Sequence, residues 1–297
     1  MTFPLIPRGR VIGLSFGTMP SLLRGTGSDV AGSRPYRTGD DVHGIDWAAS
    51  ARLSSARESD EFIVREHFAE EAARVIVVCD YRPSMAFFSP ELPWLSKPLA
   101  MRRAAELVVE SAVAAHSFVG YLDVATEEPL WRPPRTQHVP EELTFERPFT
   151  APRDALARAI AHLEEHKRVL PTGSFVFVLS DLLEAADDMW LDALEHRWDL
   201  VPVVIQDPVW EQSFPDVAGV VVRLVDPRHG RVRAVRLRAD EVAERRAANE
   251  QRRAALLERL RDLELEPVLV SSDEPGEILA AFLEWASWRQ AVRSRPW

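Results

Sequence analysis

The sequence predicts an α/β fold, with helices on both faces of a doubly wound and mostly parallel β-sheet. Strand-like and helix-like segments alternate from residue 74 onward, and most strand-like segments are apolar almost throughout, as in strands that are buried on both faces. A chain of 297 residues is also long for one compact core. We therefore expect a small N-terminal lobe at residues 1–73 and the sheet domain at residues 74–297.

The elements of the sheet domain follow in chain order from this alternation. Five segments are predicted to be its strands, at residues 74–80, 118–124, 174–181, 200–207 and 267–272. Apolar residues at helical spacing predict helices at residues 99–118, 154–168, 187–198 and 278–292. Right-handed crossovers between successive parallel strands would place these helices on the two faces of the sheet.

Two regions interrupt the alternation. Residues 125–153 contain six prolines, which predicts a long loop around one short strand at Leu130–Trp131. Residues 219–237 read as two strands joined by a turn at Pro227–Gly230, and hence as an inserted β-hairpin. The helix that follows extends to residue 265 and is charged on most of its surface, which favours a solvated helix over one that docks a partner.

The N-terminal residues 1–73 have no such alternation and predict a small lobe packed on the sheet domain. Glycine and serine are frequent as far as residue 33, and a segment of mixed chemistry follows. We expect the core of the lobe to be built on five apolar residues: Ile45, Trp47, Leu53, Phe62 and Val64.

Composition excludes several classes of protein. The formal net charge of −10 argues against binding nucleic acid, whose phosphates require a basic surface. The single cysteine, Cys79, excludes an internal disulfide and a thiolate-rich zinc site. No segment approaches the roughly 20 consecutive apolar residues that span a bilayer. We therefore expect a soluble, cytoplasmic protein without membrane insertion.

Polar residues follow two of the predicted strands where each strand ends. Asp80 and Ser84 come after the first strand, and Asp181 ends the third. Ligands of open α/β sheets bind beyond the carboxyl ends of strands, and Mg²⁺ or Mn²⁺ prefers such oxygen ligands. Thr150 can add a hydroxyl from the proline-rich loop. Arg82 stands between the first two, however, and its guanidinium would repel a cation and can itself pair with either carboxylate.

This arrangement resembles the von Willebrand factor A fold, which is Rossmann-like. The metal-ion-dependent adhesion site of that fold reads Asp-x-Ser-x-Ser after the first strand. Asp80 matches the aspartate of this motif, Ser84 matches its second serine, and Arg82 takes the place of its first serine. The resemblance implies Asp181 as the late aspartate and Thr150 as the threonine from a later loop. We favour a degenerate, metal-free site in which Arg82 supplies the positive charge; an occupied site remains the alternative.

The N-terminal segment RPYRTGDDVHGIDWAASARL, residues 34–53, closely resembles the bacterial family known as "domain of unknown function" fifty-eight. Members join such a segment to a von Willebrand factor A-like domain and are associated with MoxR-type AAA+ ATPases. Many relatives also carry two N-terminal membrane helices, for which this sequence has no counterpart. His43 stands where the family usually has arginine, so it cannot supply a permanent charge there. The resemblance implies a MoxR-type ATPase as partner, together with a client protein.

The charged and aromatic residues of this segment have two open interpretations. The charges can pair with one another and hold the lobe to the sheet, or the segment can recognise a partner directly. The candidate partner-binding residues of the segment are Arg34, Tyr36, Asp40, Asp41, Asp46 and Trp47. Phe88 and Trp94 join them if they are exposed together, although packing into the interior is the commoner outcome for such a segment.

No recognisable catalytic motif is present in the sequence. There is no glycine-rich phosphate loop and no nucleophile elbow, and Arg82 occupies the position where a phosphatase of the aspartyl-phosphate type would need a second aspartate. His162 and His166 are four residues apart, as in metal-binding pairs, but without a clear third ligand we interpret them as surface residues. We expect a non-enzymatic adaptor without a cofactor; the alternative is a metal-dependent hydrolase or adhesion module that uses Asp80 and Asp181 with Mg²⁺ or Mn²⁺.

Overall fold

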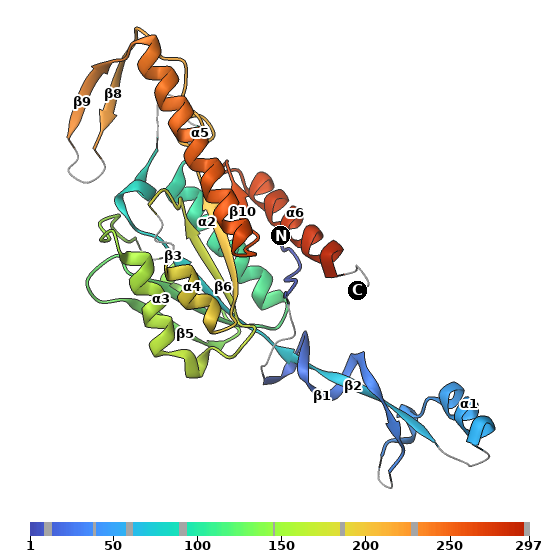
Figure 1. The fold of residues 1–297 in the computed structure, drawn as a ribbon. Coiled ribbons are helices and arrows are strands. Elements are labelled where there is room, and N and C mark those ends of the chain that lie inside the picture. Colours follow the sequence, from blue (N-terminus) through green and yellow to red (C-terminus); the bar gives the residue numbers. More distant parts are fainter. Residues whose placement is uncertain are drawn as a thin grey trace.

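The computed structural model describes residues 1–8, 14–37, 40–57, 62–88, 94–144, 146–184, 188–226 and 231–293. Its centre is a six-stranded sheet, from which one long ribbon and one helix with a hairpin extend in opposite directions (Figure 1). The strand order is β10-β7-β6-β3-β4-β5, and every neighbouring pair is parallel except β4 with β5. The expected α/β architecture with a mostly parallel sheet is therefore present.

The strands of the sheet lie close to the predicted segments. In chain order they are β3 (Arg74–Cys79), β4 (Phe118–Asp123), β5 (Leu130–Thr136), β6 (Phe175–Ser180), β7 (Asp199–Ile205) and β10 (Val268–Val270). The central strand β3 pairs with β4 on one side and with β6 on the other. All residues of β6 and β7 are buried, which explains why their sequences are apolar without alternation.

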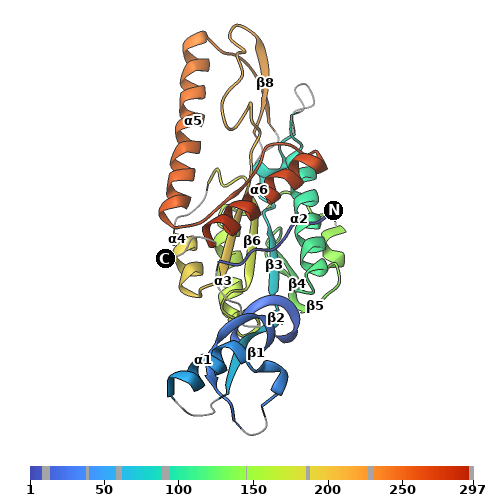
Figure 2. The same ribbon diagram turned by 90° about the vertical axis from the view of Figure 1, so that its right-hand side faces the viewer.

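Helices cover both faces of the sheet, which makes the domain a three-layer structure (Figure 2). The helices of the domain are α2 (Lys97–Ala114), α3 (Ala155–Glu165), α4 (Asp188–Glu195), α5 (Ala239–Asp262) and α6 (Pro275–Arg293). Val75 and Val77 of β3 share one apolar core with α2 and α6, whereas Ile76 and Val78 share the other with α3 and α4. Alternate side chains of one strand therefore supply both cores.

The edge strand β5 is longer than predicted. We expected a strand of two residues in the proline-rich region, but β5 runs through Pro133 and Pro134. An edge strand has a neighbouring strand on one side only. Proline has no backbone N–H group, so it is tolerated where that group would face the unpaired side. Gly120 of β4 permits the close approach of β5, since a Cβ atom there would lie 2.6 Å from the carbonyl oxygen of Arg132.

The predicted hairpin and charged helix form a projection at the carboxyl end of the sheet. The hairpin consists of β8 (Val221–Val225) and β9 (Val232–Arg236), and its predicted turn at residues 227–230 lies outside the described residues. Only Val242 and Leu260 of α5 are buried among its described residues, which agrees with the prediction of a mostly solvated helix. The upper part of α5 and the hairpin stand clear of the sheet (Figure 1).

The N-terminal region differs from the compact lobe that we expected. Two antiparallel strands, β1 (Leu14–Pro35) and β2 (Ile63–Ala72), form a ribbon that leaves the sheet at the amino end of β3 and carries α1 (Trp47–Arg57) near its tip (Figures 1 and 2). Trp47 is 64% exposed and Phe62 is 45% exposed, so neither forms a core. A two-stranded ribbon has no second layer to bury such side chains.

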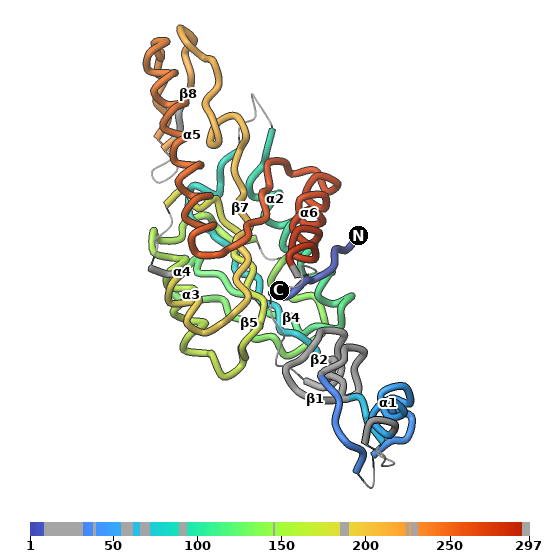
Figure 3. The backbone as a smooth tube through the Cα atoms, turned by 45° about the vertical axis from the view of Figure 1, so that its right-hand side comes forward, coloured from blue at the N-terminus to red at the C-terminus, as the bar shows by residue number. Residues whose placement is uncertain are grey.

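The first residues of the chain belong to the sheet domain. Phe3 and Leu5 are buried in the core beneath α6, and Phe3 contacts Phe282 and Trp285 of that helix. The buried Arg289 of α6 forms an ion pair with Asp199 and donates a hydrogen bond to the carbonyl of Ile6. The N-terminal segment therefore lies against the C-terminal helix (Figure 3).

Among the helices that the structure describes, none combines the length and the apolar composition needed to cross a bilayer.

Candidate functional site

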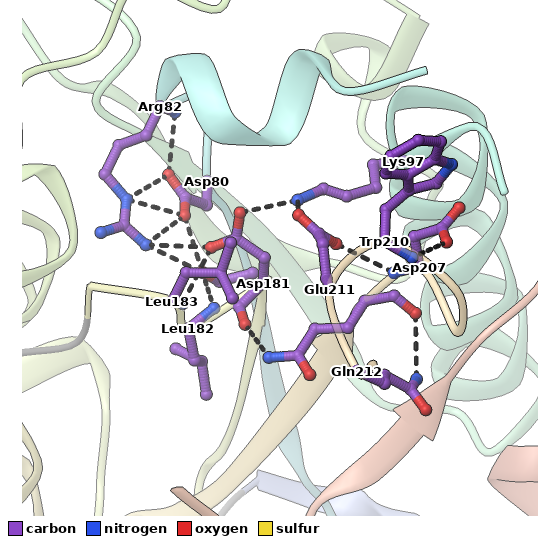
Figure 4. Close-up of polar contacts among 12 residues, drawn as sticks. Asp80, Arg82, Lys97, Asp181, Leu182, Leu183, Asp207, Trp210, Glu211 and Gln212 are labelled. Atoms are coloured by element: carbon purple, nitrogen blue, oxygen red, sulfur yellow. Dashed lines mark hydrogen bonds and ion pairs between the residues drawn. The ribbon is translucent and has the colours of Figure 1, made fainter. Parts of the chain in front are cut away.

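The candidate site lies where the strand order of the sheet reverses. From β3 the chain first adds β4 on one side and later adds β6 on the other, so the carboxyl ends of β3 and β6 flank the point at which ligands of such sheets usually bind. Asp80 follows β3, and Asp181 follows β6. Both carboxylates are almost fully buried, with 1% and 0% of their surfaces exposed. The predicted pair is therefore brought together (Figure 4).

Asp80 is enclosed by the guanidinium of Arg82 and by a serine hydroxyl. Arg82 donates from Nε to Asp80 Oδ2 at 2.9 Å and from Nη2 to the same oxygen at 2.7 Å, and its backbone amide donates to Oδ1 at 2.9 Å. Ser180 donates to Asp80 Oδ2 at 2.7 Å and accepts from Arg82 Nη2 at 3.1 Å. The remaining guanidinium nitrogen donates to the carbonyl of Glu184. Arg82, which the sequence comparison placed where the predicted metal-binding motif has a serine, thus binds the carboxylate of Asp80.

Asp181 is paired with a second buried cation, Lys97. Lys97 Nζ lies 2.8 Å from Asp181 Oδ2 and 2.6 Å from Glu211 Oε1, and its side chain has no exposed surface. Arg82 Nη2 approaches the other oxygen, Asp181 Oδ1, at 3.7 Å. One lysine therefore bridges two carboxylates that the sequence places 30 positions apart. We call the set of Asp80, Arg82, Lys97, Ser180, Asp181 and Glu211 the switch-point network.

The loop after β7 orients Glu211 within the network. The second oxygen of Glu211 accepts a hydrogen bond from the backbone amide of Asp207, and the carboxylate of Asp207 accepts from the amides of Val209 and Trp210. Gln206 donates to the backbone carbonyl of Asp181 at 2.7 Å. The loop is thus held by hydrogen bonds of its own and is joined to β6 (Figure 4).

The two carboxylates that contact Lys97 have pKa values shifted in opposite directions. Burial would raise the pKa of Asp181, but the adjacent Lys97 ammonium and the hydroxyl of Ser84 outweigh it and hold that pKa below its ordinary value. The pKa of Glu211 is raised, because burial and the nearby Asp181 exceed the attraction of Lys97. Three carboxylates face two cations in the network, so Glu211 is the group best placed to take up the balancing proton.

These donors do not fit a divalent cation. A bound Mg²⁺ needs several free oxygen ligands in octahedral geometry. The Asp80 carboxylate is held by Arg82 and Ser180, while the Asp181 carboxylate is held by Lys97 and the backbone amide of Leu183. Arg82 lies between the two aspartates, and Lys97 contacts Asp181 from its other side.

The other predicted ligands are placed differently. Ser84 lies in the turn after Asp80, and its hydroxyl helps to lower the pKa of Asp181. Thr150 is exposed on the neighbouring loop, and within the described part of the chain it has no hydrogen bond to Asp80 or Asp181. Its neighbour Ala151 instead joins that loop to the site by donating to the carbonyl of Tyr81.

Sequence reasoning missed Lys97 and Glu211 as members of the site. Lys97 is one of only two lysines in the chain, which is a signal that could have found it. Glu211 follows the strand β7 at its carboxyl end, so the rule that selected Asp80 and Asp181 also points to its loop.

Two aromatic side chains are exposed beside the network. Phe88 is 50% exposed and Trp94 is 42% exposed, and both lie between the turn that carries Ser84 and the helix that begins at Lys97. Their neighbour Leu95 is buried, so the segment divides its apolar side chains between core and surface. The inward packing that we favoured therefore holds for Leu95 and fails for the two aromatic residues.

The residues of the N-terminal motif lie far from the switch-point network, at the tip of the ribbon (Figure 1). Arg34 forms a two-pronged ion pair with Asp40, at 2.6 and 2.8 Å, and Arg65 of β2 donates to Asp46 at 2.8 Å. We call these four residues the tip cluster. Both ion pairs join residues of the ribbon and its tip to one another.

Three other candidate residues of the motif are Asp41, Tyr36 and Trp47. Asp41 accepts a hydrogen bond from the backbone amide of His43, and the amide of Tyr36 donates to the carbonyl of Phe62. Trp47 contacts the ring of Phe62 edge to face, with the ring centroids 5.9 Å apart, and remains largely exposed. Trp47 of the motif and Phe62 therefore present an aromatic pair to solvent at the tip.

Comparisons with known proteins place residues 32–255 in the family described as "Protein of unknown function DUF58". The uncharacterized protein Mb1516 of Mycobacterium bovis and the uncharacterized protein Rv1480 of Mycobacterium tuberculosis are each 27% identical over 240 residues. These alignments cover 78% of this chain and 71% of each relative. No solved structure is significantly similar to the chain.

Proposed function

The chain belongs to the family described as "Protein of unknown function DUF58", and from that premise we propose that it is a non-enzymatic adaptor. It binds a MoxR-type AAA+ ATPase and a client protein during the assembly or maturation of a protein complex. The docking surface is formed by the loops at the carboxyl end of the sheet, around a degenerate metal-ion-dependent adhesion site. The alternative is a metal-dependent hydrolase or adhesion module that uses Asp80 and Asp181.

The state of the buried charges is the observation that supports a binding role most directly. Asp80, Asp181 and Lys97 are each at most 1% exposed, and all of them are paired inside the chain. A general acid or base must reach the group whose proton it transfers. Carboxylates that are sealed by guanidinium and ammonium groups cannot do so without a rearrangement of the core. The network is therefore better suited to shaping loops than to chemistry.

The same region supports two further parts of the proposal, a fold of the von Willebrand factor A type and a site that needs no metal. The order of the parallel strands, with β3 and β6 at the reversal, is that of doubly wound ligand-binding sheets. Arg82 stands where the adhesion motif has its first serine, and it supplies a positive charge to Asp80. We propose that this arginine replaces the metal of a von Willebrand factor A-type domain and keeps its loop geometry.

The docking surface is proposed from exposed apolar groups next to these loops. Phe88 and Trp94 are half exposed, and aromatic side chains with such exposure commonly anchor protein partners. The family resemblance supplies the identity of the partner class. Trp47 and Phe62 at the tip of the ribbon are proposed as a second contact, because they are exposed as a pair.

Co-purification tests the proposal. A MoxR-type ATPase, ideally one encoded beside the gene for this protein, is co-expressed with the tagged full chain, and capture is measured without nucleotide, with ADP and with a slowly hydrolysed ATP analogue. We expect the wild type to capture the ATPase. The double variant Phe88→Ser/Trp94→Ser should capture much less of it, and Trp47→Ser should reduce the capture by a smaller amount.

The matched control for these variants is Trp288→Ser, because Trp288 is also 50% exposed but lies on α6. It should leave capture unchanged. Arg82→Glu is unsuitable as a surface variant, because Arg82 is buried and the change would place a fourth carboxylate in the network. The proposal is wrong if no nucleotide state yields capture, or if the control reduces capture as much as the aromatic variants do.

Calorimetric titration distinguishes the alternative. We expect no heat of binding when Mg²⁺ or Mn²⁺ is added to the purified protein, because Arg82 and Lys97 hold the two carboxylates. Heat that disappears in Asp181→Ala would instead support a metal-dependent site and would contradict the metal-free interpretation.

A further inference from the structure

A second cluster of polar side chains lies at the C-terminal end of α3, on the outer face of the protein. His162 and Glu165 belong to the last turn of this helix, and His166 is the residue that follows it. Each of the three offers a ligand atom, and these atoms lie within 4.8 Å of one another. The sequence shows the two histidines at the spacing of a metal-binding pair but no clear third ligand. The structure places Glu165 beside them as that third ligand.

The two imidazoles are held in place by each other and by β5. Their ring centroids are 4.3 Å apart and the rings are tilted by 31°. Trp131 of β5 lies against both rings, with centroid distances of 5.5 Å to His162 and 5.7 Å to His166. The indole forms a wall that limits the rotamers of both histidines. A prearranged pair of this kind loses little conformational freedom on binding a ligand.

The hydrogen bonds of the cluster leave lone pairs available. Nδ1 of His166 lies 2.8 Å from the backbone carbonyl of His162, and a carbonyl can only accept, so Nδ1 carries the proton and Nε2 of His166 has the free lone pair. Metal-binding histidines are commonly oriented in this way by a backbone carbonyl. Nε2 of His162 is buried and has no hydrogen-bond partner among the described residues, which is unusual for a polar atom.

We propose that His162, Glu165 and His166 bind one divalent transition-metal ion of the zinc class. Two imidazoles and one carboxylate suit Zn²⁺ and leave a fourth tetrahedral position for water, whereas Mg²⁺ prefers oxygen ligands throughout. Small rotations of the side chains bring the donor atoms to about 2.1 Å from a shared ion. The site lies on α3 at the end remote from Asp80 and Asp181, so it is independent of the proposed adaptor surface.

Titration with the metal alone tests this proposal. The purified full chain, without a histidine tag, is titrated with Zn²⁺ by calorimetry, and with Co²⁺ by visible absorption to report a tetrahedral site. We expect one equivalent to bind, and we expect His162→Gln and His166→Gln each to abolish the binding. Glu165→Gln should weaken it.

The adjacent carboxylate provides the matched control. Glu164 precedes Glu165 and faces His196 at 3.8 Å, so Glu164→Gln and His196→Gln should leave Zn²⁺ binding unchanged. Circular dichroism checks that each variant keeps its helical content. The proposal is overturned if the wild type gives no heat with Zn²⁺, which would leave the histidines as a pair packed on Trp131. Binding that persists in both histidine variants would also overturn it, because the ion would then be held elsewhere.

Discussion

The molecule contains two arginine–aspartate pairs with almost the same contact distance in opposite surroundings. In the switch-point network, Arg82 and Asp80 approach to 2.7 Å, and their side chains are 4% and 0% exposed. In the tip cluster, Arg34 and Asp40 approach to 2.6 Å, and their side chains are 30% and 19% exposed. Contact distance therefore does not distinguish the two pairs, whereas burial does.

The buried and the exposed pair therefore differ in how much they affect the stability of the fold. A buried charge that loses its partner stays in a medium that solvates it poorly, so the remaining group destabilises the fold. An exposed charge that loses its partner is solvated by water. The switch-point network is thus part of the domain's core, while the tip cluster shapes a surface whose residues can change at little cost to folding.

The largest effect is expected for Lys97→Met. This change leaves Asp181 and Glu211 buried beside each other without their shared cation, and it should lower the free energy of unfolding by about 3–5 kcal/mol. Urea denaturation measures the loss. The control is Lys167→Met, which removes the other lysine at an exposed position and should have almost no effect. Equal losses in the two variants would show that the network is not a core element.

A smaller effect is expected for Ser180→Ala. The hydroxyl donates to Asp80 and accepts from Arg82 and from the amide of Leu182, so its removal leaves several buried partners unsatisfied. We expect a loss of about 1–3 kcal/mol in the free energy of unfolding. Ser213→Ala removes a hydroxyl that bonds Glu250 at the surface and should change stability much less. The comparison fails if the surface variant costs as much as the buried one.

The smallest effect is expected for the tip cluster, and pH reveals it. The hydrogen bond from Arg34 is the main cause that lowers the pKa of Asp40 from 3.8 to about 2. Because the folded-state pKa lies below the unfolded value, the stabilisation by Asp40 is complete above about pH 4 and is lost as the pH falls through about 2.

Titration of the Asp40 side chain by nuclear magnetic resonance should give the low pKa in the wild type and a value closer to 3.8 in Arg34→Gln. The unfolding midpoint at neutral pH should scarcely change in that variant. An unchanged Asp40 pKa in Arg34→Gln would show that the ion pair does not form in solution.

The central sheet could be predicted because its strands are buried on both faces. Burial on both faces gives apolar runs, such as the one that ends at Cys79, and these runs alternate with helical segments of clear periodicity. The ribbon of β1 and β2 could not be predicted in this way. Its strands pair with repeated shifts of register, so a regular alternation of apolar and polar residues is not maintained along them.

Part of the candidate site could be predicted because strand ends converge. Asp80 and Asp181 follow neighbouring strands, and topology alone places them together. Lys97 could not be placed, because it belongs to a helix and reaches Asp181 only through the packing of α2 on the sheet. The prediction of Thr150 rests on its place in the proline-rich loop, and such local placement does not determine which way a loop side chain points.

The contact between the two ends of the chain has a consequence for biosynthesis. Phe3 packs on Phe282 and Trp285, and Arg289 bonds the carbonyl of Ile6 across 283 positions. During translation the first residues emerge long before their partners in α6. The apolar surface beneath that helix therefore stays uncovered until α6 has been synthesised. Contacts of such long sequence separation form slowly, so this apolar surface is exposed to aggregation until α6 has folded onto it.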